Sequence, residues 1–166
     1  MQATDYCVPS RCMIQTDIFE KLVRYCTYSE RCSFDVQRKM QTLKVPANER
    51  PAYLDELKEQ RFLDDVRFAK MYVHTCSTVK RQGKAKIQAA LRARGIQQSL
   101  IKDLLSEVAD DDIESNALIL AKRKLNSLKK GEPNEKRLKV LRFLISRGFS
   151  MREAQQAVKT AMTEGC

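Results

Sequence analysis

The chain contains few of the residues on which catalysis and metal binding usually depend. Among 166 residues there is a single histidine, His74, no tryptophan, only five glycines and only four prolines. No Gly-x-Ser-x-Gly motif occurs, and no glycine-rich phosphate loop precedes a predicted helix. We therefore expect no enzyme activity and no cofactor.

Paired metal-ligand motifs and long apolar runs are also missing. The six cysteines include no Cys-x-x-Cys pair, and His74 has only Cys76 nearby, so the sequence favours reduced core or surface cysteines over a zinc site or a disulfide scaffold. No run approaches the roughly 18 apolar residues of a membrane span. Residues 1–12 lack a basic segment followed by an apolar one. These absences predict a cytoplasmic protein without a metal.

Acidic residues are absent from residues 66–102, which carry +9 of the formal net charge of +10. Such a basic segment is a plausible footprint for phosphates or for an acidic protein groove. The alternative is a solvated helix surface, which would explain isolated cations better than nine without a counter-charge. The nine residues are Arg67, Lys70, Lys80, Arg81, Lys84, Lys86, Arg92, Arg94 and Lys102.

Strand signals are scarce, whereas apolar residues recur at three- and four-residue spacing along almost the whole chain. The spacing predicts an all-α protein with helices over residues 16–28, 33–43, 49–60, 64–82, 84–94, 98–108, 112 to about 128, 134–147 and 152–162. Asp64 is expected to be an N-cap, with Asp65 favouring the positive end of the helix dipole. Neighbouring carboxylates on a helix diverge by about 100°, which disfavours a metal pair there.

The helices repeat in groups of three. Arg94-Gly95-Ile96 and Arg147-Gly148-Phe149 stand at equivalent places, each between a second and a third helix. A degenerate first copy has Lys44-Val45-Pro46 at that place. The predicted division is a loose tail over 1–15 and three-helix repeats over 16–60, 61–109 and 110–166.

Particular residues in these repeats resemble those of a known family. The run Phe62-Leu63-Asp64-Asp65-Val66-Arg67-Phe68-Ala69-Lys70-Met71-Tyr72-Val73 is followed by Gly83, Ile87, Leu91, Gly95 and Ile96. The last repeat contains Leu141, Arg142, Phe143, Leu144, Arg147, Gly148, Phe149 and Ser150. Both sets are similar to signatures of the RecX family of bacterial regulatory proteins, which modulate the RecA recombinase, and the resemblance covers residues 16–162.

The resemblance implies three tandem three-helix units that form an elongated, curved monomer. It also implies binding along the groove of the RecA filament on single-stranded DNA, with inhibition of the ATPase, strand-exchange and coprotease activities of RecA and effects on DNA repair and the SOS response. The residues expected to contact the filament or its DNA are Arg67, Lys80, Arg81, Lys84, Lys86, Arg92, Arg94, Lys122, Lys124, Lys139, Arg142 and Arg147.

Two other functions fit the same residues. One is a sequence-tolerant DNA- or RNA-binding module without RecA as a partner, since three-helix units can have the outline of a helix-turn-helix reader. The other is a helical scaffold that binds only protein.

Six aromatic residues could stack on bases, but their positions favour core packing. They are Tyr53, Phe62, Phe68, Tyr72, Phe143 and Phe149.

Overall fold

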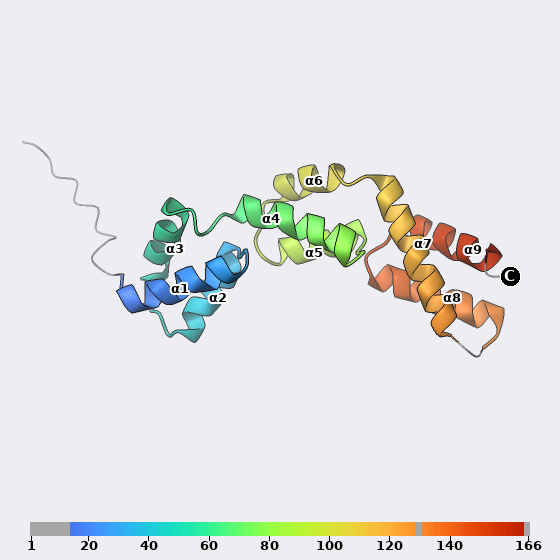
Figure 1. Cartoon of the computed structure of the whole chain (residues 1–166), viewed down its shortest axis with the longest axis horizontal. Coiled ribbons are helices and arrows are strands. Elements are labelled where there is room, and N and C mark those ends of the chain that lie inside the picture. Colours follow the sequence, from blue (N-terminus) through green and yellow to red (C-terminus); the bar gives the residue numbers. More distant parts are fainter. Residues whose placement is uncertain (1–13, 129–130, 165–166) are drawn as a thin grey trace, which may run out of the picture. The chain divides into compact units, whose positions relative to one another are not determined.

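The chain is helical throughout the part described by the computed structural model, residues 14–128 and 131–164 (Figure 1). The predicted all-α class is confirmed, and the predicted tail lies mostly outside the described residues. The elements are α1 (Thr16–Tyr28), α2 (Ser33–Thr42), α3 (Arg50–Glu59), α4 (Asp65–His74), the π-helical turn η2 (Thr75–Val79), α5 (Lys84–Arg92), α6 (Gln98–Ser106), α7 (Asp110–Ser127), α8 (Pro133–Ser146) and α9 (Met151–Thr163).

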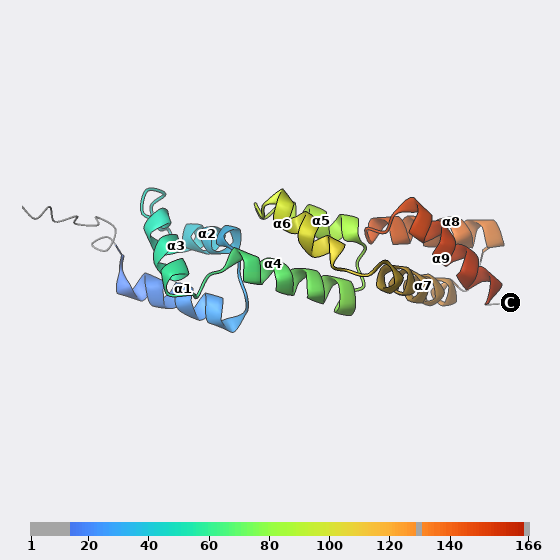
Figure 2. The same cartoon turned by 90° about the horizontal axis from the view of Figure 1, so that it is seen from above.

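These elements belong to two compact units, one ending at Phe68 and one beginning at Ala69. The first unit contains α1, α2 and α3, with α2 packed on its two neighbours. The second contains most of α4, then η2, α5 and α6, and the bundle of α7, α8 and α9, which pack on one another (Figure 2). The predicted limits of the repeats, and the predicted elongated shape, stay predictions.

The step from second to third helix is the same in all three repeats. One residue with positive φ ends the second helix, and the next residue, which is buried, donates its N–H to the carbonyl oxygen five positions earlier. The donor–acceptor pairs are Val45 to Met40 at 3.0 Å, Ile96 to Leu91 at 3.2 Å and Phe149 to Leu144 at 3.2 Å. The first repeat makes the step with Lys44 at a φ of 59°, where the other two have Gly95 and Gly148.

The core follows the predicted faces in most helices. In α9 the helical spacing predicts an inward face of Ala154, Ala157, Val158 and Ala161, and all four are buried. In α8 the same spacing predicts buried Leu138, Leu141, Leu144 and Ile145; Leu144 is buried, but the prediction is wrong for Leu138 and Ile145, whose exposed fractions are 51% and 39%. Val140 is buried instead and lies about 160° around the helix from Leu138. After Asp64 the spacing predicts one inner face of Val66, Ala69, Val73 and Cys76; the last three are buried, but the prediction is wrong for Val66, which has an exposed fraction of 46%.

The start of α5 meets the turn between α8 and α9 inside the second unit. The N–H of Gly83 donates to the carbonyl oxygen of Arg147 at 3.0 Å, and the N–H of Ala85 donates to that of Gly148 at 3.2 Å. A Cβ added to Gly83 would lie 2.1 Å from the Gly148 oxygen, and one added to Gly148 would lie 2.5 Å from the backbone nitrogen of Lys86. Two glycines are therefore needed for this contact, which we call the glycine joint.

Replacing Gly83 with alanine should lower the free energy of unfolding of the second unit by about 2 kcal/mol, because the added Cβ meets backbone that cannot rotate away. Gly83 has a φ of −71°, which any residue adopts. Without the glycine joint, the same substitution would be neutral or stabilising. Urea unfolding followed by circular dichroism measures the difference.

Gly95→Ala is the matched control. Gly95 has a φ of +74° and nothing within 4 Å of an added Cβ, so alanine there strains only the backbone, at about 1 kcal/mol. A Gly83→Ala protein as stable as the parent would contradict the joint.

Three thiols, those of Cys26, Cys32 and Cys76, are buried, which confirms the predicted core role for them. Burial raises the pKa of Cys26 and of Cys32 to about 11. Both thiols therefore stay protonated at neutral pH and are poor nucleophiles. Cys7, Cys12 and Cys166 lie outside the described residues.

Iodoacetamide at pH 8 should alkylate Cys26 and Cys32 in the native protein at least about tenfold more slowly than in urea, because burial removes both access and thiolate. Peptide mass spectrometry distinguishes the sites. Equal rates in the two conditions would show that these thiols are not held in a core.

Candidate protein and nucleic-acid interface

The two aspartates at the start of α4 hold two helix ends. The carboxylate of Asp64 accepts the N–H of Val66 at 2.8 Å and that of Arg67 at 3.0 Å, which confirms the predicted N-cap. The carboxylate of Asp65 accepts both the N–H and the hydroxyl of Ser33 at 2.6 Å, at the first residue of α2. Nothing in the sequence signals the contact of Asp65 with Ser33, because the two residues are 32 positions apart.

Within the described ranges, no cluster of three or more His, Cys, Asp or Glu could hold a metal ion.

Several of the predicted binding residues meet at the glycine joint. The guanidinium of Arg147 donates to the carbonyl oxygen of Lys80, and the ammonium of Lys86 donates to the carbonyl oxygen of Ser146 at 3.2 Å. Both side chains thus connect the second repeat to the third. The two charges add to a basic surface, and the two hydrogen bonds to backbone oxygens also stabilise the fold.

Lys84, at the first position of α5, forms an ion pair with Asp110, at the first position of α7, with 2.8 Å between Nζ and Oδ1. The hydrogen bond and charge of Lys84 lower the pKa of the Asp110 carboxyl. The run Asp110-Asp111-Asp112 predicts a negatively charged helix start, and all three residues lie in the first turn of α7. One of these carboxylates thus neutralises a predicted binding lysine.

Tyr72 of α4 lies between two cations. The Cζ of Arg94 is 5.2 Å and the Nζ of Lys80 is 5.8 Å from the centre of its ring. Arg94 also donates to the carbonyl oxygen of Ala90 at 2.9 Å, so the end of α5 fixes its position. Tyr72 is half-buried, in contrast to Tyr53, Phe68 and Phe149, for which the predicted core packing is confirmed.

Two predicted residues beside this cluster are placed differently. Arg81 follows η2 with a φ of 48° and is half-buried. Arg92 is exposed at the end of α5, and its Nε donates to the side-chain oxygen of Gln98 at 2.5 Å. The structure thus brings Lys80, Arg94 and Arg147 together and leaves Arg92 on the adjacent surface.

The remaining predicted residues have other contacts. In the first unit, Arg67 pairs with Glu30 at 2.6 Å, and this hydrogen bond raises the pKa of the guanidinium. In the last bundle the contacts are Lys122 with Glu164 at 2.5 Å, Lys139 with Glu135 at 3.6 Å and Lys124 over the Phe143 ring at 5.6 Å. Arg142 is exposed on α8. None of these contacts involves Lys80, Arg94 or Arg147.

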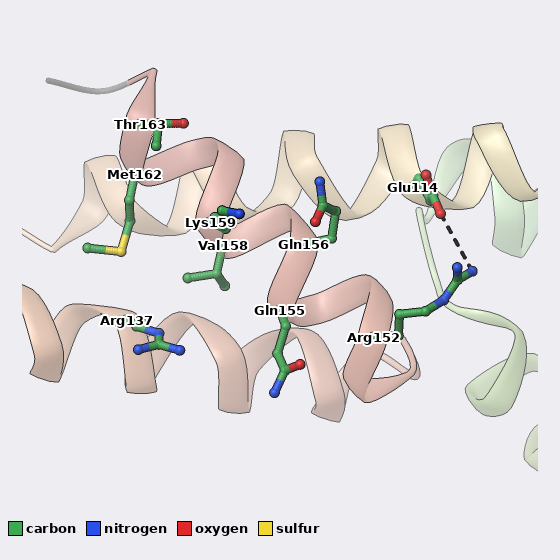
Figure 3. A pocket seen from close by; sticks show the side chains of 9 residues that line it. All are labelled: Glu114, Arg137, Arg152, Gln155, Gln156, Val158, Lys159, Met162 and Thr163. Atoms are coloured by element: carbon green, nitrogen blue, oxygen red, sulfur yellow. Dashed lines mark ion pairs between the residues drawn. The ribbon is translucent and has the colours of Figure 1, made fainter.

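A second group of cations was not among the predicted residues. Arg152 and Lys159 of α9 and Arg137 of α8 line a surface groove of about 910 Å³ (Figure 3). Glu114 of α7 lies at its edge, 3.7 Å from the guanidinium of Arg152. Positions 152 and 159 are two helical turns apart, so the helical period of residues 151–163 would have placed them on one face.

The fold and these surfaces define an all-helical protein of tandem three-helix repeats with basic faces. None of the described helices is both long and apolar enough to cross a membrane. Residues 64–105 match the model of the second three-helix domain of RecX, and residues 110–158 match the model of the third. The chain belongs to the RecX family.

Individual proteins show the same relationship. Regulatory protein RecX of Herbaspirillum seropedicae is 30% identical over 141 residues, which are 85% of this chain and 88% of that protein. Regulatory protein RecX of Clostridium botulinum is 37% identical over 111 residues, 66% of this chain and 51% of the relative. The chain thus spans about half the length of the clostridial relatives that it matches. A crystal structure of regulatory protein RecX has the same fold, with a TM-score of 0.76 and 24% identity over 87% of this chain and 70% of that one.

The ion pair at the start of α7 predicts a specific titration. Because Lys84 depresses the folded-state pKa of Asp110, the pair stabilises the fold above the unfolded pKa, about 3.9, and the contribution is lost as the pH falls through the folded value. NMR titration of the carboxyl carbon should give a pKa below 3.9 in the parent, by the same reference value. Lys84→Gln should raise it, whereas Lys86→Gln should not. An unchanged pKa in Lys84→Gln would contradict the pair.

Proposed function

We propose that this protein binds the RecA filament on single-stranded DNA and inhibits its ATPase, strand-exchange and coprotease activities. The observation that carries the proposal is the basic cluster at the glycine joint, where Lys80, Arg94 and Arg147 come from three separate segments of one compact unit. Membership of the RecX family supports RecA as the partner. The inhibition would act through binding, without a catalytic residue of this chain.

The basic cluster suits a filament because its charges are held in place. Arg94 is positioned by the Tyr72 ring and the Ala90 carbonyl oxygen, and Arg147 by the Lys80 carbonyl oxygen, so these two arginines have little side-chain freedom to lose on binding. A RecA filament on DNA presents phosphates and protein side by side. Rigid arginines suit such a surface because guanidinium groups bind phosphates and carboxylates with two hydrogen bonds.

The test is titration of the protein into a RecA ATPase assay on single-stranded DNA. The parent should inhibit hydrolysis, and inhibition should weaken steeply with salt if phosphates dominate the contact. Arg92→Glu with Arg94→Glu should raise the concentration needed for half-inhibition about tenfold or more, which corresponds to about 1.4 kcal/mol. Lys80→Glu alone, at an exposed position of the basic cluster, keeps the test valid if the double variant loses helix content.

Arg24→Glu with Lys58→Glu changes the net charge equally at exposed positions of the first unit and serves as the matched control. Full inhibition by the Arg92 and Arg94 double variant and by Lys80→Glu would show that the basic cluster is not the contact surface. If the parent protein itself left RecA hydrolysis unchanged at every salt concentration, the proposed function would be wrong.

A further inference from the structure

The outer face of α9 has a chemistry that the regulation of RecA does not explain. Its exposed residues are Met151, Arg152, Gln155, Gln156, Lys159 and Thr163, and none is acidic. The backbone positions of Arg152 and Lys159 are separated by about 10 Å along the helix, and Gln155 and Gln156 lie on the turn between them, one to each side of the line that joins them. The side chain of Arg152 has an exposed fraction of 81%. The face therefore presents two cations and two amides to a partner.

The third helices of the other repeats differ in this respect. The exposed residues of α3 include Asp55 and Glu59 with a single lysine, and those of α6 pair Lys102 with Asp103. In both helices, the exposed lysine has an exposed acidic residue within three positions. The basic and amide face is a property of α9 among the third helices, so the general fold of the repeat does not account for it.

The inner side of α9 holds this face rigidly. Its buried residues are mostly alanines, which allow close packing on α7 and α8. The helix begins with a capping box in which the N–H of Glu153 donates to the Ser150 hydroxyl and the N–H of Ser150 donates to the Glu153 carboxylate. Together with the preceding glycine turn, this gives two helices joined by a short, fixed connection, as in a helix-turn-helix unit.

We propose that the exposed face of α9 binds double-helical DNA, with the helix in the major groove. A helix of about 10–12 Å diameter fits a groove about 12 Å wide. Arg152 and Lys159, which lie on one line of the helix, contact phosphates, and Arg137 contacts the strand beside α8. Gln155 and Gln156 diverge by about 100° and reach base edges on either side of that line, where glutamine pairs with adenine. This binding needs no RecA and is independent of the function proposed above.

DNA fits this face better than an acidic protein does. A protein interface is usually anchored by aromatic or large apolar side chains at its centre. The centre of this face has Gln155, Gln156 and Lys159, with methionines only at its edges. Glu114 is the one carboxylate lining the groove, and it lies against Arg152, so a phosphate would compete with it for that guanidinium.

The experiment is fluorescence anisotropy of the full chain with a labelled DNA duplex, without RecA, over a range of salt concentrations. Arg152→Gln with Lys159→Gln should weaken duplex binding about tenfold and reduce the salt slope by about two. Glu114→Gln should tighten binding about twofold, because it removes the competing carboxylate. Gln155→Ala with Gln156→Ala should weaken binding about fivefold at an unchanged salt slope, which a purely electrostatic role would not produce.

Arg24→Gln with Lys58→Gln removes the same charge from the first unit and should stay within about twofold of the parent. Far-ultraviolet circular dichroism checks the helix content of each variant. Equal losses in this control, or parent-like duplex binding by the Arg152 and Lys159 variant, would overturn the proposal. So would stronger binding to single-stranded DNA or to polyglutamate than to the duplex. Loss of duplex binding with RecA inhibition retained would separate this surface from the basic cluster.

Discussion

The close approach of two glycine backbones, Gly83 and Gly148, is the constraint on which the second unit depends. Neither position has room for a Cβ, and two hydrogen bonds cross the contact from the start of α5 to the α8–α9 turn. Because these bonds are between backbone groups, they fix the two elements in distance and in orientation. The guanidinium of Arg147 and the ammonium of Lys86 then reach carbonyl oxygens on the opposite sides of the joint.

Some of the positive charge of the chain has a structural role at the glycine joint. From the sequence, a segment with +9 and no acid resembles a continuous binding surface. In the structure, part of the positive charge of the chain stabilises the fold, because Lys84 pairs with Asp110 and Lys86 and Arg147 hold backbone oxygens. Arg147 also belongs to the basic cluster. Other cations are exposed along several helices, and the two proposed contact surfaces are the basic cluster and the face of α9. Two separate surfaces would allow a protein filament and a duplex to be contacted by different parts of one unit.

The features that depend on residues close together in the sequence could be predicted from it. The helices, the Asp64 cap and the glycine turns follow from patterns within a few residues, and the structure places them within a few residues of the expected bounds. Ser150, a residue type that favours the N-cap, likewise caps α9. The RecX resemblance rested on such patterns as well. For the candidate site, the sequence identified the basic segment, and the contact of Lys80 and Arg94 with Tyr72 is consistent with its place at the edge of the apolar face.

Contacts between distant segments could not be predicted in the same way. Gly83 has an ordinary φ, so nothing in its neighbourhood signals the approach of Gly148, and Asp65 gives no sign that it binds Ser33. Leu138 was placed in the core because leucines recur on that face of α8, whereas packing on α7 and α9 selects the face of Val140. The face of α9 was missed because its cations are spaced by a helical period and are not adjacent in sequence.

Amide hydrogen exchange at Gly83 and Ala85, followed by NMR, tests the glycine joint most directly. Both amides stand at the start of α5, where N–H groups have no partner within their own helix and ordinarily exchange fast. If the joint forms in solution, these two amides are protected as strongly as the interior of α5, because they donate to Arg147 and Gly148. Exchange at the rate of an exposed helix start would contradict the joint and the rigid basic surface that is built on it.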